Sequence, residues 1–361
     1  MTGGVGGVEH RMRPLAGAVV LMFGLGVVTG TVHGTRPPTP AAAASASAAT
    51  PQATSGARPG ADELPLSDPQ ALDLTHSGYQ LPSAASLYAA RIVDGDDDGP
   101  PRYDDYVAGG GALDRDFWPA STVKLLAALG ALDFAASLGF TGAATVSVDA
   151  DYSWTLREIY RSAIVDSDNL DYDMLIRIAG FDRLNQEFLP HNGFPTTIIQ
   201  RSYSGLDVRW SPEIIFEEDG RTAVVPEREG TGEYDCPDEG NCTDLFELSE
   251  AVRRLVLDPS LPPDQRFAVS GADVAALNDA LAGAGSFFSA GVERVFGAGA
   301  TVQGKPGVAA GRDCVDTAVV TAPTGERYLL SATIPDEGFD LECEGLSDLA
   351  AAVLPLLARL S

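Results

Sequence analysis

The sequence predicts an α+β fold in which helices flank one antiparallel sheet. Strand-like patterns lie near both ends of the folded part, at 84–93 and again within 300–334, and helical patterns fill the stretch between them. Residues 123–132 are apolar on every side, which is typical of a helix that is buried on every side. With 361 residues, 45% of them hydrophobic, the chain can form a sizeable core. We therefore expect the terminal strands to pair in one sheet.

The first 36 residues have the pattern of an export segment. Arg11 and Arg13 precede an uncharged run, 15–32, rich in Ala, Gly, Val and Leu. This run suits either a cleaved signal peptide or an N-terminal membrane anchor, and both remain open for 1–36. Residues 37–61 are rich in Ala, Pro and Ser and predict a disordered linker. We expect 62–361 to form one folded domain, outside the cell or in the cell envelope.

The first half of this domain mixes strands and helices. Strands are expected at 84–93 and 102–107, and the buried helix is expected to begin at Ser121. Residues 147–151 are interpreted as a loop. The segment Thr155-Leu156-Arg157-Glu158 has the pattern of a capping box, which predicts the start of another helix.

The second half returns to strands near its end. Residues 202–241 are rich in Pro, Gly and acidic residues and are interpreted as a surface insertion. A hairpin is expected at Pro323-Thr324-Gly325, between the last two strands. The remaining helices are expected at 170–179, 182–189, 245–257, 272–282 and 346–360, and the last strands at 300–308, 317–321 and 327–334.

Charge and cysteine content exclude several classes of partner. A net charge of −27 argues against nucleic acid and anionic membrane surfaces, since both would be repelled. Four cysteines in an exported chain suggest two disulfides, and we pair Cys236 with Cys242 and Cys314 with Cys343. Their spacing fits no zinc pattern, so we expect no metal and no cofactor.

One charged residue stands on the predicted buried helix. Lys124 is costly to bury, and Ser121, three residues earlier, lies on the same helical face. Burial lowers the pKa of a lysine, and a neutral amine beside a hydroxyl can act as the base of a nucleophile. A serine three residues before a lysine also occurs by chance. The chain, however, has 22 arginines and only two lysines, Lys124 and Lys305, and arginine cannot serve as such a base.

Three short motifs in a fixed order carry a family resemblance. They are Ser121-x-x-Lys124, Ser167-Asp168-Asn169 and Lys305-Pro306-Gly307. Over residues 82–361 the sequence resembles the class A serine β-lactamases and the related penicillin-binding DD-peptidases. The resemblance implies an antiparallel sheet flanked by helices with an all-helical subdomain, and a monomer that acts on a small-molecule or peptidoglycan-like substrate.

The resemblance also implies a role for each site residue. Ser121 would be the acylated nucleophile, Lys124 would take its proton, and Ser167 would pass a proton to the leaving nitrogen. The expected substrate-binding residues are Asn169, which would also hold Lys124; Lys305, which would attract a substrate carboxylate; Gly307; and Val308, whose N–H would form the oxyanion hole with that of Ser121.

The chain departs from this family pattern at two points. Pro306 stands where the family has Thr or Ser, and it offers neither a hydroxyl nor a backbone N–H. No E-x-x-L-N segment, whose glutamate activates the deacylating water in class A enzymes, is found in 181–245. We expect a serine hydrolase that acts on β-lactams or related amides and esters. The alternatives are a penicillin-binding protein with slow deacylation and a non-catalytic cell-envelope binding module.

Overall fold

The structure is a computed structural model that describes residues 69–95, 99–114, 117–148, 152–237, 240–336 and 343–360. The predicted export segment and linker lie outside the described residues, so both stay predictions.

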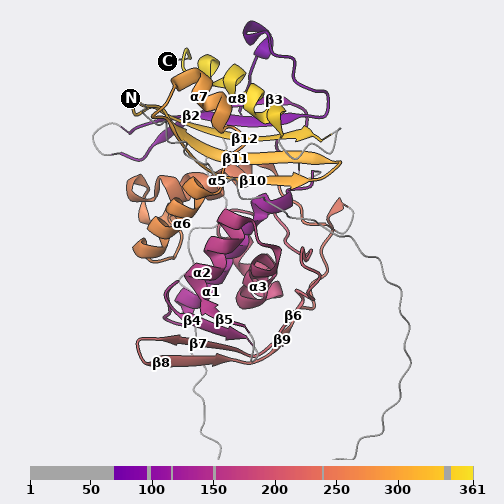
Figure 1. The fold of residues 1–361 in the computed structure, drawn as a ribbon, viewed down its shortest axis with the longest axis vertical. Helices are drawn as coiled ribbons and strands as arrows, with labels where there is room; N and C mark the ends of the chain where they lie inside the picture. The colour runs from indigo at the N-terminus through magenta and orange to yellow at the C-terminus, as the bar shows by residue number, and fades with distance from the viewer. Residues whose placement is uncertain are drawn as a thin grey trace, which may run out of the picture. The chain divides into compact units, whose positions relative to one another are not determined.

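The main sheet joins the two ends of the described chain. Its strand order is β1-β3-β2-β12-β11-β10, so β2, near the start, pairs antiparallel with β12, near the end (Figure 1). The expected pairing of terminal strands is confirmed. Only β1 departs from the antiparallel pattern, because it pairs parallel with β3. The strands are β1 (Gln70–Ala71), β2 (Ser86–Val93), β3 (Arg102–Gly109), β10 (Thr301–Ala309), β11 (Asp313–Thr321) and β12 (Arg327–Pro335).

Both faces of this sheet are buried, as β2 shows most clearly. Leu87 and Ala89 pack in one hydrophobic cluster, whereas Tyr88 and Ala90 pack in the other. Successive side chains of a strand point to opposite faces, so a strand covered on both sides is almost continuously apolar. Helices α7 (Ser289–Phe296) and α8 (Glu344–Leu357) belong to the first cluster, and α5 (Leu245–Val256) belongs to the second.

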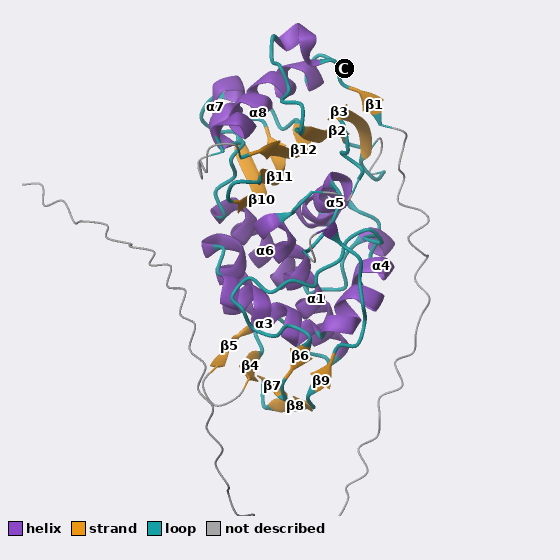
Figure 2. Ribbon diagram, turned by 90° about the vertical axis from the view of Figure 1, so that its right-hand side faces the viewer, coloured by secondary structure: helices purple, strands orange, loops and turns teal. Residues whose placement is uncertain are grey.

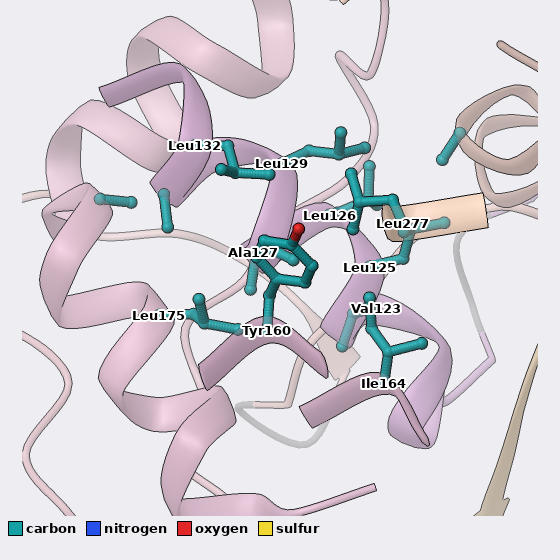
Figure 3. Packing of buried hydrophobic residues seen from close by; sticks show 14 of the residues in the cluster. Val123, Leu125, Leu126, Ala127, Leu129, Leu132, Tyr160, Ile164, Leu175 and Leu277 are labelled. Carbon is teal, nitrogen blue, oxygen red and sulfur yellow. The ribbon is translucent and has the colours of Figure 1, made fainter. Parts of the chain in front are cut away.

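A helical layer surrounds α1 (Lys124–Ser137), which follows a 3-10 turn at Ala120–Val123. The segment Ala120–Ser137 is long and apolar enough to cross a membrane, but most of it is buried inside the protein. Figure 3 shows side chains of neighbouring segments packed around this helix, among them Tyr160, Ile164 and Leu175. The layer also contains α2 (Leu156–Arg161), α3 (Asn169–Ala179), α4 (Leu189–His191) and α6 (Gly271–Gly283), with π-helical turns at Ser162–Asp166 and Arg183–Phe188. Figure 2 labels α1, α3, α4 and α6 of this layer. The capping box predicted from the sequence is present at the start of α2, where the side chains of Thr155 and Glu158 bond to each other's backbone N–H groups.

Two sequence interpretations of this region were wrong. Residues 147–151 were expected as a loop, but Ser147 and Val148 belong to a strand of a second sheet. This sheet has the order β5-β4-β7-β8, and short polar strands of this kind carry little periodic signal. Its strands are β4 (Thr145–Val148), β5 (Tyr152–Thr155), β7 (Ile214–Glu218) and β8 (Arg221–Val225); β6 (Trp210–Ser211) pairs separately with β9 (Arg228–Glu229).

Residues 202–241 are therefore not a simple surface insertion. They contribute strands β6 to β9, and Phe216 and Val225 within them are part of the main core. At the ends of the segment, Tyr203 and Asn241 lie against the helical layer through hydrogen bonds to Ala120 and Tyr172. These hydrogen bonds join residues that are distant in sequence, so local sequence patterns could not predict them.

Both expected disulfides are present. Cys236 is bonded to Cys242, and Cys314, on β11, is bonded to Cys343, which precedes α8. The first closes a short loop, and the second ties the terminal helix to the sheet. Among the described residues there is no free cysteine.

We expect the longer disulfide loop to stabilise the protein more. Closing a longer loop removes more conformational entropy from the unfolded chain, so replacing Cys314 and Cys343 by alanine should lower the free energy of unfolding by about 3.6 kcal/mol. The corresponding loss for Cys236 and Cys242 should be about 2.4 kcal/mol. Urea unfolding followed by circular dichroism measures both; a larger loss for the short loop would contradict this order.

Candidate active site

Ser121 lies on the 3-10 turn that leads into α1. The preceding residue, Ala120, has a φ of 46°, a left-handed conformation that is unfavourable for a residue other than glycine. The Tyr203 hydroxyl donates a hydrogen bond of 2.7 Å to the Ala120 carbonyl oxygen and holds this conformation. The backbone around Ser121 is thus fixed by tertiary contacts.

Lys124 begins α1 and is fully buried, with an exposed fraction of 0%. Its Nζ donates to Asn169 Oδ1 at 2.7 Å, to the Asp168 carbonyl oxygen at 3.1 Å and to the Ser167 carbonyl oxygen. These acceptors are all uncharged, although Coulombic attraction by the Asp168 carboxylate partly favours the charged amine. The site therefore solvates the ammonium group without pairing it directly with an anion.

Burial lowers the pKa of Lys124 to about 7, and the charge of Lys305 adds to this effect. The rings of Tyr172 and Tyr203 each lie 5.8 Å from Nζ and form an aromatic wall beside it. Because they stack on each other with centroids 4.6 Å apart, they exclude water from that side. Near neutral pH a substantial fraction of Lys124 is then an uncharged amine.

Ser167 lies between the two lysines. Its Oγ is 3.1 Å from Lys305 Nζ and 3.4 Å from Lys124 Nζ. Burial lowers the pKa of Lys305 to about 8. Ser167 itself has a φ of 56°, and the Asp168 side chain caps α3 immediately after it by accepting from Asp171 N–H at 2.9 Å. A hydroxyl between two amines of lowered pKa can donate its own proton to a substrate atom and accept a proton from one of the two lysines.

Strand β10 forms the other wall of the site. A Cβ on Gly307 would lie 2.7 Å from the backbone nitrogen of Ser121 and 3.1 Å from the Pro119 carbonyl oxygen. Only glycine permits this approach, which brings the N–H of Ser121 close to the strand. Pro306 is compatible with the strand because β10 is the edge of the sheet.

A cavity of about 400 Å³ opens beside Ser121. Its lining combines the turn that carries Ser121 with α3, β10 and the segment that begins at Arg201. Among the residues that the structure describes, the charged groups of the lining are two arginines, and none is a carboxylate. The lining residues are Trp118, Ala120, Ser121, Asn169, Arg201, Ser202, Tyr203, Val308, Ala309, Ala310 and Arg312.

All seven residues expected in the site occur in this region. Hydrogen bonds connect Lys124, Ser167, Asn169 and Lys305, Gly307 abuts Ser121, and Val308 lines the same cavity as Ser121. In the described part of the chain, no cluster of His, Cys, Asp and Glu side chains is placed to hold a metal ion.

Sequence reasoning missed the groups that hold the segment 202–204. The buried Asp173 carboxylate on α3 accepts from Ser202 Oγ at 2.6 Å, from Tyr203 N–H at 2.8 Å and from Ser204 N–H at 2.8 Å. The Asn241 amide donates to the Tyr203 hydroxyl at 2.9 Å. One signal was available: Asp173 is four residues after Asn169 and so lies on the same face of its helix.

Comparison with known proteins assigns the family. The family model described as "Beta-lactamase enzyme family" matches residues 112–354, about two thirds of the chain. The chain belongs to the β-lactamase enzyme family. No curated protein is similar enough in sequence to match it.

Solved structures of β-lactamase-like proteins share the fold. PBP-A is 17% identical, with a TM-score of 0.55, and the match covers 81% of this chain and 98% of PBP-A. A β-lactamase from Burkholderia vietnamiensis is 17% identical, with a TM-score of 0.55 and coverage of 80% and 96%. The class A β-lactamase from Mycobacterium abscessus is 17% identical, with a TM-score of 0.53 and coverage of 79% and 98%. These neighbours confirm the predicted class A β-lactamase-like α+β fold.

The lysine pKa values can be measured directly because the chain has only two lysines. We expect the ¹³Cε signals of labelled lysine to titrate near pH 7 for Lys124 and near pH 8 for Lys305, since burial opposes the charge of both. A Lys305→Arg variant assigns the two signals. Titration of both near the ordinary value of about 10.4 would contradict the interpretation of the site.

Proposed function

We propose that this β-lactamase-family protein is a serine acyl enzyme in which Ser121 reacts with a β-lactam or a related amide or ester. One observation carries the proposal: Lys124 is buried among uncharged acceptors one helical turn after Ser121, with a pKa lowered to about 7. An amine of that pKa is a suitable general base near neutral pH. A PBP-A mutant of the same fold was described as an acyl-enzyme complex with penicillin-G, which supports penicillins as probes.

Each proton of the proposed acylation has a donor and an acceptor. Neutral Lys124 takes the proton of Ser121 as its Oγ attacks the substrate carbonyl carbon. The backbone N–H groups of Ser121 and Val308 stabilise the oxyanion, an interaction that commonly contributes about 2.7–4 kcal/mol per donor. Ser167 then gives its proton to the leaving nitrogen and regains one from Lys124. The charge of Lys305 favours this transfer and attracts a substrate carboxylate.

The cavity favours slow hydrolysis of the acyl enzyme. Deacylation needs a base that faces the attacking water, and the described residues that line the cavity include neither a carboxylate nor Lys124. Tyr203 occupies part of the lining, but burial raises its pKa to about 12, so its hydroxyl stays neutral at pH 7 and is a poor base. We infer that the acyl enzyme persists, as expected for a penicillin-binding protein rather than for an efficient β-lactamase.

We further infer that the protein acts outside the cytoplasm. Two disulfides and the N-terminal sequence pattern support this location, because disulfides persist in oxidising compartments.

The mass of the intact protein tests acylation at Ser121. After mixing residues 62–361 with benzylpenicillin, we expect an adduct that forms in the wild type, is absent in Ser121→Ala, and decays slowly. Rapid disappearance of the adduct would instead indicate an efficient β-lactamase. Absence of any adduct with penicillins, cephalosporins and fluorophosphonates would favour the non-catalytic binding module.

The pH dependence of acylation tests the base. Lys124 is active when it has lost its proton, so the rate should rise through pH 7; Lys305 is active when charged, so the rate should fall above pH 8. In Lys124→Arg, which stays charged, acylation should fall by about 10²-fold or more. Circular dichroism controls for folding. A folded variant with near-normal acylation would exclude Lys124 as the base.

A further inference from the structure

The described residues that line the cavity beside Ser121 have a charge opposite to that of the protein as a whole. The chain has 51 acidic residues against 24 basic ones, yet the charged groups among the described lining residues are Arg201 and Arg312. Both guanidinium groups stack on one indole ring: the Cζ of Arg201 lies 4.3 Å and that of Arg312 4.9 Å from the Trp118 centroid. The two guanidinium groups thus bring N–H donors from two distant segments to the same ring beside the cavity.

The backbone fixes Arg201. Its N–H donates to Asn241 Oδ1 at 2.8 Å, and its carbonyl oxygen accepts from the Tyr172 hydroxyl at 3.3 Å. Asn241 and Tyr172 are both buried. The backbone of Arg201 is thus held by Asn241 and Tyr172, two side chains of the wall of the site, while its guanidinium group lies against Trp118.

Arg312 is held by the turn after β10. Its N–H donates to the Ala309 carbonyl oxygen at 2.8 Å, and its own carbonyl oxygen accepts from Asp336 N–H at 2.8 Å. The carboxyl group of Asp313 interacts electrostatically with Arg312. The two arginines therefore come from distant segments that the fold holds on one ring.

The arginines lie at the end of the site opposite to Lys305. Along β10, Lys305 precedes Gly307 and Val308, whereas Arg312 follows them, and the lining of the cavity includes neither Lys305 nor Ser167. In the proposed reaction Ser167 protonates the leaving group. The cavity on the Arg312 side is then the place of the acyl part of the substrate.

We propose that Trp118, Arg201 and Arg312 form a subsite for an anionic substituent on the acyl part of the substrate, such as the carboxylate of an acidic acyl peptide. Guanidinium groups bind carboxylates through paired, charge-assisted hydrogen bonds, and the indole holds both groups in place. The inference rests on the proposed acylation of Ser121, and it adds a preference that the three sequence motifs do not contain.

Three penicillins that differ at one position test this preference. Benzylpenicillin has a neutral side chain, carbenicillin has an additional carboxylate there, and ampicillin has an amine; all three have the same ring carboxylate. We expect the second-order acylation rate constant to be highest for carbenicillin and lowest for ampicillin. Added salt should reduce the difference, because it screens exposed charges.

Variants of the two arginines identify the subsite. In Arg201→Gln and Arg312→Gln the ratio of the carbenicillin to the benzylpenicillin rate constant should fall, by roughly 10-fold in the double variant. Because the benzylpenicillin rate constant is measured in the same variant, the ratio separates loss of the anion preference from any general effect on acylation. Arg359→Gln, which removes an exposed positive charge near the C-terminus, is the matched control and should keep the wild-type ratio. An unchanged ratio in the folded double variant, with benzylpenicillin still acylating Ser121, would overturn the subsite alone.

A binding measurement keeps the test independent of acylation. The monoamide of phenylmalonic acid and phenylacetamide carry the side chains of carbenicillin and benzylpenicillin on a neutral amide, so the first is an anion and the second is uncharged. Isothermal titration calorimetry measures the binding of both. We expect the monoamide of phenylmalonic acid to bind more tightly than phenylacetamide to the wild type and equally weakly to the double variant, even if no penicillin reacts. Equal binding of both to the wild type would overturn the subsite, whereas absence of acylation with selective binding would overturn only the proposed reaction.

Discussion

The site depends on one costly constraint, a lysine amine buried without a direct counter-ion. A carboxylate hydrogen-bonded to Lys124 would lower the cost of burial, but it would also raise the pKa of the amine and remove its value as a base. The structure instead offers two carbonyl oxygens and an amide oxygen. This solution requires the chain to reverse direction at Ser167, whose left-handed conformation lies beside the carbonyls that face Lys124. The cap of α3 and the aromatic wall then complete the environment.

Much of this framework could be predicted from the sequence. The continuous apolar pattern around Lys124 indicated its burial, and the alternating or continuous apolar strands at both ends indicated one sheet. These features depend on local periodicity, which is visible in a single sequence. The wall formed by Tyr203 could not be predicted, because its order comes from Asp173 and Asn241, which bind backbone and side-chain groups far away in the sequence. Helix α7 also escaped prediction, since its eight residues span only about two helical turns, too few for a clear helical period.

The edge position of β10 reconciles an unusual residue with the site. A proline inside a sheet would remove a backbone hydrogen bond, but an edge strand has one side without a partner strand. The adjacent glycine is the more demanding position, because the backbone nitrogen of Ser121 lies where a side chain would be. The strand thus tolerates Pro306 while Gly307 sets the distance between strand and nucleophile.

The short disulfide loop links the site to the oxidation state of Cys236 and Cys242. Asn241, which holds both Tyr203 and the backbone of Arg201, lies within the small ring closed by Cys236 and Cys242. In a reducing compartment that ring is open, and Asn241 would be carried on a longer, less constrained segment. Through Asn241, this disulfide would therefore contribute to the order of the wall beside Lys124, although the wall itself is made of tyrosine rings.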